Sequence, residues 1–203
     1  MRWLKTVAIV LVVGLVALGG RYLLLAPSDM TAGVGTSGAA AIGGPFELVD
    51  GASGKTVTAE DFKGRYMLVY FGYTFCPDVC PSALSTVGQA LDMLPPATAA
   101  RIEPVFITVD PERDTPEVVG EYVSHFHPRL RGLSGSVEQV RAVTKAYRVY
   151  AAKADQDDKD PTSYLMDHSA IAYVMGPDGA FLTHLSHGVT AEQVAGILAK
   201  HVQ

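Results

Sequence analysis

The chain has 203 residues, a net charge of −5 and only two cysteines. This length suits one domain with an appended segment, and two cysteines exclude a disulfide-dense small fold and any zinc or iron–sulfur site that needs four cysteines. The acidic balance argues against a broad nucleic-acid-binding face, so we expect no nucleic-acid partner.

The N-terminal residues 1–26 are strongly apolar and predict a membrane anchor, with a cytoplasmic tip and one transmembrane helix. A helix over residues 3–26 would be about 36 Å long, enough to cross the hydrocarbon core of a bilayer. Arg2 and Lys5 favour a cytoplasmic N-terminus, so the remaining chain would lie outside the cytoplasm. An Arg-rich transit segment is missing, which favours a bacterial inner membrane with the soluble domain on the periplasmic side. A cleaved secretory signal is the alternative.

Residues 27–44 are rich in glycine and alanine and predict a flexible linker, which leaves residues 45–203 as the folded domain. The first element of this domain is a hairpin over residues 46–58, and the apolar run 66–71 predicts a strand covered on both faces. The alternation of strands and helices indicates an α/β sandwich around a mixed central sheet. The later elements follow in chain order: a helix over 84–94, a strand over 102–109, helices over 115–126 and 137–147, an acidic surface loop over 154–164, a hairpin over 170–185 and a helix over 190–202.

The two cysteines, Cys76 and Cys80, lie in a turn between the predicted strand 66–71 and the helix that follows it. Open α/β sheets place ligands and chemistry at such a strand end, and a helix N-terminus lowers the pKa of a thiol. Three interpretations stay open: an inert disulfide or buried thiol pair, a redox pair with three intervening residues, or a metal site. Nearness in sequence and the proline-rich turn disfavour the inert pair.

For a metal site, the six histidines are the candidate partners of the two thiols. Two thiolates with an imidazole suit copper, because Cu(I) prefers thiolates and Cu(II) accepts imidazole, whereas structural zinc usually takes four ligands. His168 is the leading candidate, because it follows the acidic loop and precedes an apolar strand. His184 and His187 are the alternatives. His125 and His127 end a helix and are expected to be solvated.

Three segments, in this order, resemble the Sco/SenC family: FGYTFCPDVCP at 71–81, TVDPERDTP at 108–116 and DHS at 167–169. The resemblance covers about residues 42–203, and members of this family are membrane-tethered copper proteins. It implies a thioredoxin-like sandwich with a mixed central sheet, preceded by one N-terminal transmembrane helix. In the family, the two motif cysteines and the downstream histidine bind copper. The resemblance therefore implies Cys76, Cys80 and His168 as ligands of Cu(I) or Cu(II).

The resemblance implies a copper chaperone, rather than an enzyme, that delivers one copper ion to the binuclear copper site of cytochrome c oxidase during assembly. The copper-bearing oxidase subunit is then the main partner, and other copper chaperones or thiol reductants are further partners. The second hypothesis is a membrane-tethered thiol–disulfide reductase that keeps the oxidase copper-ligand cysteines reduced, with Cys76 and Cys80 as its redox pair. Peroxide reduction is suggested only by the scaffold.

Several other side chains near these motifs have structural interpretations. Asp110 and Asp114 are expected to hold their loop through side-chain–backbone bonds and an ion pair with Arg113. Asp78 either tunes the charge of the site or stays solvated. Asp167 either orients the neighbouring imidazole or stays solvated. Three methionines are expected to pack rather than bind copper: Met67, Met93 and Met166.

Overall fold

The computed structural model describes residues 42–154 and 163–202. The predicted anchor over 1–26, most of the predicted linker 27–44 and much of the predicted loop 154–164 lie outside these residues. Within the described ranges, no helix is both long enough and apolar enough to cross a membrane.

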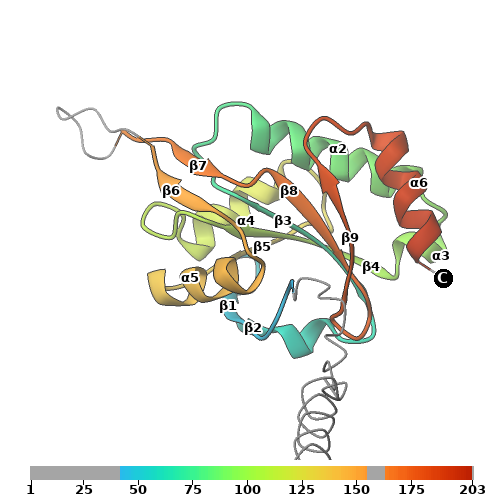
Figure 1. Ribbon diagram of the computed structural model, residues 1–203, viewed down its shortest axis with the longest axis horizontal. Helices are drawn as coiled ribbons and strands as arrows, with labels where there is room; N and C mark the ends of the chain where they lie inside the picture. Colours follow the sequence, from blue (N-terminus) through green and yellow to red (C-terminus); the bar gives the residue numbers. More distant parts are fainter. Residues whose placement is uncertain (1–41, 155–162, 203) are drawn as a thin grey trace, which may run out of the picture. The chain divides into compact units, whose positions relative to one another are not determined.

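Seven strands form one mixed sheet in the order β2-β1-β5-β4-β3-β8-β9 (Figure 1). β3 (Tyr66–Gly72) pairs in parallel with β4 (Ile102–Thr108) and antiparallel with β8 (Ile171–Met175). All seven residues of β3 are buried, as its unbroken apolar run predicts. The expected α/β class with a mixed central sheet is therefore confirmed.

Both predicted hairpins are present in this sheet. The first joins β1 (Glu47–Asp50) to β2 (Thr56–Thr58), and the second joins β8 to β9 (Phe181–Ser186). The sequence pattern does not predict β5 (Arg131–Ser134), which pairs with β4 and β1, because it is short and contains a glycine. A separate two-stranded ribbon of β6 (Ala151–Lys153) and β7 (Met166–His168) is also not predicted.

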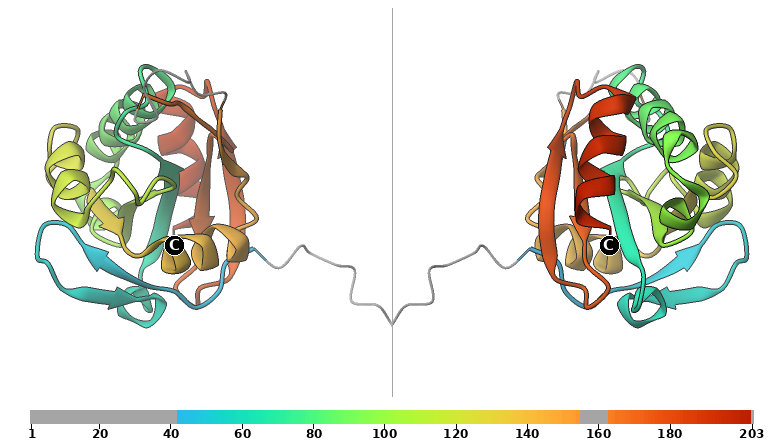
Figure 2. Two further views of the ribbon diagram at one scale, coloured as in Figure 1. Left: turned by 90° about the vertical axis from the view of Figure 1, so that its left-hand side faces the viewer. Right: turned by 90° about the vertical axis from the view of Figure 1, so that its right-hand side faces the viewer.

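Helices cover both faces of the sheet (Figure 2). Successive side chains of a strand point to opposite faces. On one face, Tyr70 stacks on Phe106 and its hydroxyl reaches Cys80 at the start of α2 (Val79–Met93). On the other face, Phe71 packs on Tyr147, which ends α5 (Val137–Ala146). The start of α2, with the cysteine pair, therefore lies on the face opposite α5.

α4 and α6 begin where the sequence predicts them, whereas α3 is not predicted. α4 (Pro116–Ser124) follows Thr115, whose side chain accepts a hydrogen bond from the backbone N–H of Val118. α6 (Ala191–His201) begins after a capping box made by Thr190 and Gln193, and it packs against α2. α4 ends two residues before the predicted end, and the short α3 (Pro96–Ala99) follows α2.

Candidate metal centre

The cysteine pair lies at the carboxyl end of β3, where the chain turns into α2. The backbone N–H of Cys76 donates to the carbonyl of Tyr73 at 3.3 Å, and the backbone N–H of Cys80 donates to Cys76 Sγ at 3.4 Å. Cys80 is fully buried and Cys76 is partly exposed, and both are free thiols. The turn therefore presents one accessible thiol and one enclosed thiol on the same side.

Gly72, the last residue of β3, leaves the space that Cys80 occupies. A Cβ atom at this position would lie 2.7 Å from Cys80 Sγ and 2.9 Å from the ring of Phe106. Real Cβ contacts are not that short, so any larger residue would displace the sulfur or the aromatic ring. No local sequence pattern reveals the role of this glycine, because that role depends on a contact between two elements.

His168 reaches the thiol pair from β7. Its Nε2 atom lies 3.4 Å from Cys80 Sγ, and the two sulfurs and one imidazole nitrogen all lie within 4.8 Å of one another. The rings of Tyr70 and Tyr73 face the imidazole edge-on, at centroid distances of 6.4 and 5.7 Å. The structure thus brings together the three residues that the sequence singles out.

Burial sets the electrostatics of these groups. It raises the pKa of the Cys80 thiol, although the Tyr70 hydroxyl donates to that sulfur at 3.9 Å. The expected lowering of the thiol pKa by the helix N-terminus is therefore not found at Cys80, because desolvation by burial is the largest effect on this group and raises its pKa. Burial also lowers the pKa of His168, which keeps the imidazole neutral with a lone pair available for a metal.

The second nitrogen of His168, Nδ1, is buried and makes no hydrogen bond of normal geometry among the described residues. The backbone of Ser169 is close enough to oppose the lowering of the His168 pKa. Asp167 is exposed and acts on the ring through its charge, which also opposes the lowering of the His168 pKa. Asp78, between the cysteines, is also exposed.

The other histidines lie apart from the thiols. His184 is exposed and stacks on Phe181, and His187 is exposed on the loop after β9. His125 is exposed, as expected, but His127 is buried and its Nε2 lies 3.4 Å from Asp92. The expectation of a solvated His127 is therefore wrong, because the residue packs against α2 near Gly88.

The methionine predictions hold for two of three residues. Met67 is buried in β3, and Met166 is partly buried and packs against the core. Met93 is 52% exposed, so its expected core position is wrong: it is the last residue of α2 and faces solvent.

Asp110 and Asp114 hold the loop after β4 in place through their side chains, as expected. Asp114 accepts hydrogen bonds from the backbone N–H and the hydroxyl of Thr74, at 3.0 and 2.6 Å. Asp110 forms an ion pair with Arg113 at 2.5 Å. Tyr164, which no sequence motif connects to this loop, donates its hydroxyl to Asp110 at 2.8 Å.

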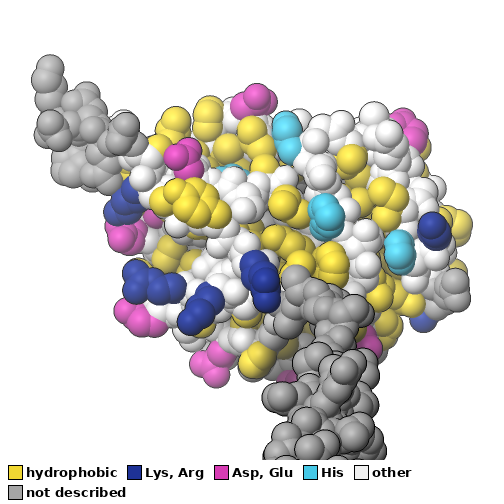
Figure 3. Space-filling view, in the orientation of Figure 1, with side chains coloured by type: hydrophobic (Ala, Val, Ile, Leu, Met, Phe, Trp, Pro, Cys, Tyr) yellow, Lys and Arg dark blue, Asp and Glu magenta, His cyan; other side chains and the backbone are white. Residues whose placement is uncertain are grey.

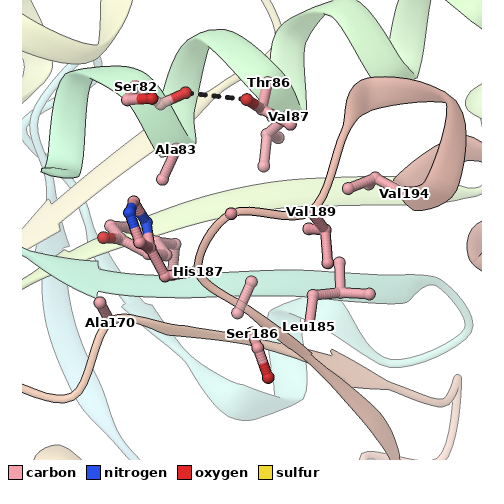
Figure 4. A pocket seen from close by; sticks show the side chains of 13 residues that line it. Ser82, Ala83, Thr86, Val87, Ala170, Leu185, Ser186, His187, Val189 and Val194 are labelled. Atoms are coloured by element: carbon pink, nitrogen blue, oxygen red, sulfur yellow. Dashed lines mark hydrogen bonds between the residues drawn. The ribbon is translucent and has the colours of Figure 1, made fainter.

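A pocket of about 230 Å³ lies behind the site, between α2 and the segment that follows β9 (Figure 4). Tyr70 lines this pocket and also contacts Cys80, and Ser82, Ala83 and His187 line it as well. Phe75, next to Cys76, is exposed, and Tyr150 and Leu165, which directly precede β6 and β7, are exposed as well. Figure 3 shows hydrophobic side chains gathered over β7 and the turn before α2.

Two thiols and one neutral imidazole form a donor set that suits a thiophilic ion such as copper. The three donor atoms lie within 4.8 Å of one another, and the lowered pKa of His168 leaves its nitrogen unprotonated. The residues present therefore fit a copper ion. A fourth His, Cys, Asp or Glu ligand does not join the cluster within the described ranges, which disfavours a closed structural zinc site.

Comparison with known proteins gives a consistent set of relatives. The SCO1/SenC family profile matches residues 34–203. The protein SCO1 homolog 1, mitochondrial, of Arabidopsis thaliana is 46% identical over 147 residues, which are 72% of this chain and 43% of that protein. A SCO2-like protein of Rickettsia felis is 39% identical over 186 residues, 89% of each chain. The chain thus spans less than half of the first relative and most of the second.

Among solved structures, Bradyrhizobium japonicum ScoI with copper bound is 43% identical. The TM-score is 0.71, and the alignment covers 79% of this chain and 99% of that chain. This likeness, with the sheet order described above, confirms the expected thioredoxin-like α/β fold.

Proposed function

This chain belongs to the SCO1/SenC family, and we propose that it is a copper chaperone that carries one copper ion on Cys76, Cys80 and His168. The cargo would be delivered to the binuclear copper site of cytochrome c oxidase during assembly, with the copper-bearing subunit as acceptor. The solved relative from B. japonicum has copper bound, which supports copper as the cargo.

One observation carries the proposal: two free thiols and an imidazole nitrogen lie within 4.8 Å of one another. They come from distant parts of the chain, the turn before α2 and the strand β7. A pair of cysteines alone would serve redox chemistry equally well. A redox pair does not require a neutral histidine beside the buried thiol, whereas a copper site gains a third ligand from it.

The two thiols play different parts in loading and release. Cys80 is enclosed and its pKa is raised, so loading must displace its proton, and the Tyr70 hydroxyl donates a hydrogen bond that stabilises the resulting thiolate. Cys76 is partly exposed, so an incoming thiolate of the acceptor reaches its side of the site first. Transfer then proceeds by ligand exchange, with the enclosed Cys80 and His168 released last.

The surface around the thiols suits contact with a partner protein. Phe75, next to Cys76, is 58% exposed, and Leu165 and Tyr150 are exposed near His168. Exposed apolar side chains of this size are common at binding sites. Other copper chaperones or thiol reductants would reach the thiols over the same surface.

The membrane anchor over residues 1–26 and the linker 27–44 remain part of the proposal. An anchor would confine the domain to one membrane face and raise its effective concentration near a membrane-bound oxidase. The expected location is a bacterial inner membrane with the domain in the periplasm. Deletion of residues 1–26 should move the protein from the membrane fraction to the soluble fraction.

A second candidate function is thiol–disulfide reduction of the oxidase copper-ligand cysteines, which the unequal exposure of the two thiols favours. Cys76 thiolate would attack a partner disulfide, forming a mixed disulfide and releasing one partner thiolate. Cys80 would then attack Cys76 Sγ, forming the Cys76–Cys80 disulfide and releasing the second partner thiolate. Two electrons pass from the dithiol to the partner, so an external reductant must regenerate the pair.

Anaerobic copper titration of the reduced full-length protein in detergent separates these functions. The thiolate-to-copper absorption should saturate at one copper per chain. His168→Ala should weaken Cu(II) binding at least tenfold and leave the rate of disulfide exchange unchanged. The matched control is His184→Ala, which removes an exposed histidine that does not join the cluster.

The chaperone proposal fails if the reduced protein takes up no copper. His168 is not the third copper ligand if the His168→Ala protein binds Cu(II) as tightly as the parent protein. Rapid turnover of a disulfide substrate together with a strongly reducing dithiol potential would support the reductase instead.

A further inference from the structure

We propose that Arg113, in the loop between β4 and α4, is a positioning residue that holds the His168 segment in place against the cysteine turn. Arg113 does not belong to the donor cluster, and no ligand role is assigned to it. The inference rests on the proposed copper-binding function, because it concerns how the third ligand is kept within reach of the two thiols.

The need for such a residue follows from where His168 lies. It belongs to β7, whose one partner among the described strands is β6, in a ribbon outside the seven-stranded sheet. β6 and β7 have three residues each, so their ladder alone fixes the imidazole weakly. A ligand must be held within about 0.5 Å of its productive position, so other contacts must place this segment.

Arg113 supplies those contacts on the histidine side. Its Nη1 donates to the carbonyl oxygen of Tyr164 at 2.9 Å, four residues before His168. The guanidinium carbon also lies 3.6 Å from the centroid of the Tyr164 ring, a stacked cation–π geometry. The Tyr164 hydroxyl donates to Asp110. The carbonyl, the ring and the hydroxyl of Tyr164 therefore all contact the loop that carries Arg113.

The same guanidinium reaches the cysteine side. Its carbon lies 4.6 Å from the ring centroid of Phe75, the residue before Cys76, and 5.9 Å from that of Tyr73. Phe75 is 58% exposed, and this contact with Arg113 lies at the protein surface. One planar cation thus lies between the aromatic side chains that flank the cysteine turn and the histidine segment.

The loop that carries Arg113 is itself fixed to the sheet. Asp110 and Asp114 are 2% and 0% exposed. Asp114 accepts from the hydroxyl of Thr108, the last residue of β4, at 2.7 Å, and Asp110 forms the 2.5 Å ion pair with Arg113. β4 pairs directly with β3, and β3 leads into the cysteine turn. The sheet therefore fixes the position of the Arg113 loop relative to the two thiols.

The test combines Arg113→Gln with His168→Ala in the reduced, full-length protein. Arg113→Gln should weaken Cu(II) binding about tenfold and reduce the thiolate-to-copper absorption per bound ion. In the His168→Ala background the same change should alter affinity less than about twofold, because no imidazole remains to be positioned. Tyr164→Phe, which removes only the bond to Asp110, should weaken Cu(II) binding in the same direction by a smaller factor.

The matched control is Arg65→Gln. It removes a guanidinium whose ion pair with Glu103 lies at the start of β3, at the end away from the cysteine turn, and leaves the Arg113 contacts in place, so its affinity should equal that of the parent. Hydrogen exchange of the metal-free protein gives a readout that needs no copper. Arg113→Gln should accelerate exchange in residues 163–169 and leave β3 unchanged.

The proposal is overturned if Arg113→Gln leaves both affinity and exchange of 163–169 unchanged. It is also overturned if the loss of affinity is equally large with and without His168, since Arg113 would then support the thiols or the fold rather than the histidine. If the parent protein binds no copper, the proposed function fails, and the exchange measurement still decides whether Arg113 holds the segment.

Discussion

Replacement of Gly72 by alanine tests the packing that brings Cys80 into the site. The added Cβ would lie 2.7 Å from Cys80 Sγ and 2.9 Å from Phe106 Cε2, in a region where both side chains are fully buried. Overpacking of a buried core typically costs about 1–3 kcal/mol. For a domain of this size each kcal/mol lowers Tm by about 2–4 °C, so we expect a clear loss of stability together with weaker copper binding.

The measurement is denaturant unfolding of the reduced, metal-free protein, followed by copper titration. Gly196→Ala is the matched control, because a Cβ there meets no atom within 4 Å on the exposed face of α6. That change should leave copper binding intact and raise stability by up to about 1 kcal/mol. Adding Cys80→Ala to Gly72→Ala should relieve part of the loss, since it removes the closest contact. A Gly72→Ala protein with parental stability and copper affinity would refute this account of the packing.

Three further changes probe separate contacts. Tyr70→Phe removes the hydroxyl that donates to Cys80 Sγ and keeps the ring, so copper affinity in competition assays should fall by a factor of about five, the equivalent of about 1 kcal/mol. Asp114→Asn replaces one of the oxygens that accept from Thr74 and Thr108, and unfolding should show a loss of about 1–3 kcal/mol. Burial lowers the pKa of His168, so the metal-free fold keeps its full stability above pH 6.5 and loses stability as pH falls below it, because protons bind the unfolded chain first. A His168→Gln protein should show a smaller loss over the same acid range, and identical pH curves would contradict the burial effect.

The sequence predicts the framework of the fold well where its patterns are long. The apolar run of β3, both hairpins and the caps at Thr115 and Thr190 all lie where expected. β5 and the β6–β7 ribbon are missed, because three or four residues carry too little periodicity to separate a strand from a loop. Their pairing depends on neighbouring strands rather than on local propensity.

The candidate site is predictable in its residue types and less so in its environment. The spacing of Cys76 and Cys80 and the family resemblance indicate the donor set, and the structure brings both thiols to His168. The raised pKa of Cys80 could not be predicted, since it depends on burial by side chains from β3 and β4. The roles of Gly72 and Arg113 likewise depend on contacts across 8 to 51 residues of chain, which no local pattern reveals.

The coordination of bound copper tests the central claim most directly. X-ray absorption of the protein loaded with one equivalent of copper should show two sulfur ligands and one histidine nitrogen, and His168→Ala should lose the nitrogen while it keeps both sulfurs. A copper environment without sulfur, or one in which the histidine nitrogen persists in His168→Ala, would contradict the assignment of Cys76, Cys80 and His168 as the metal centre.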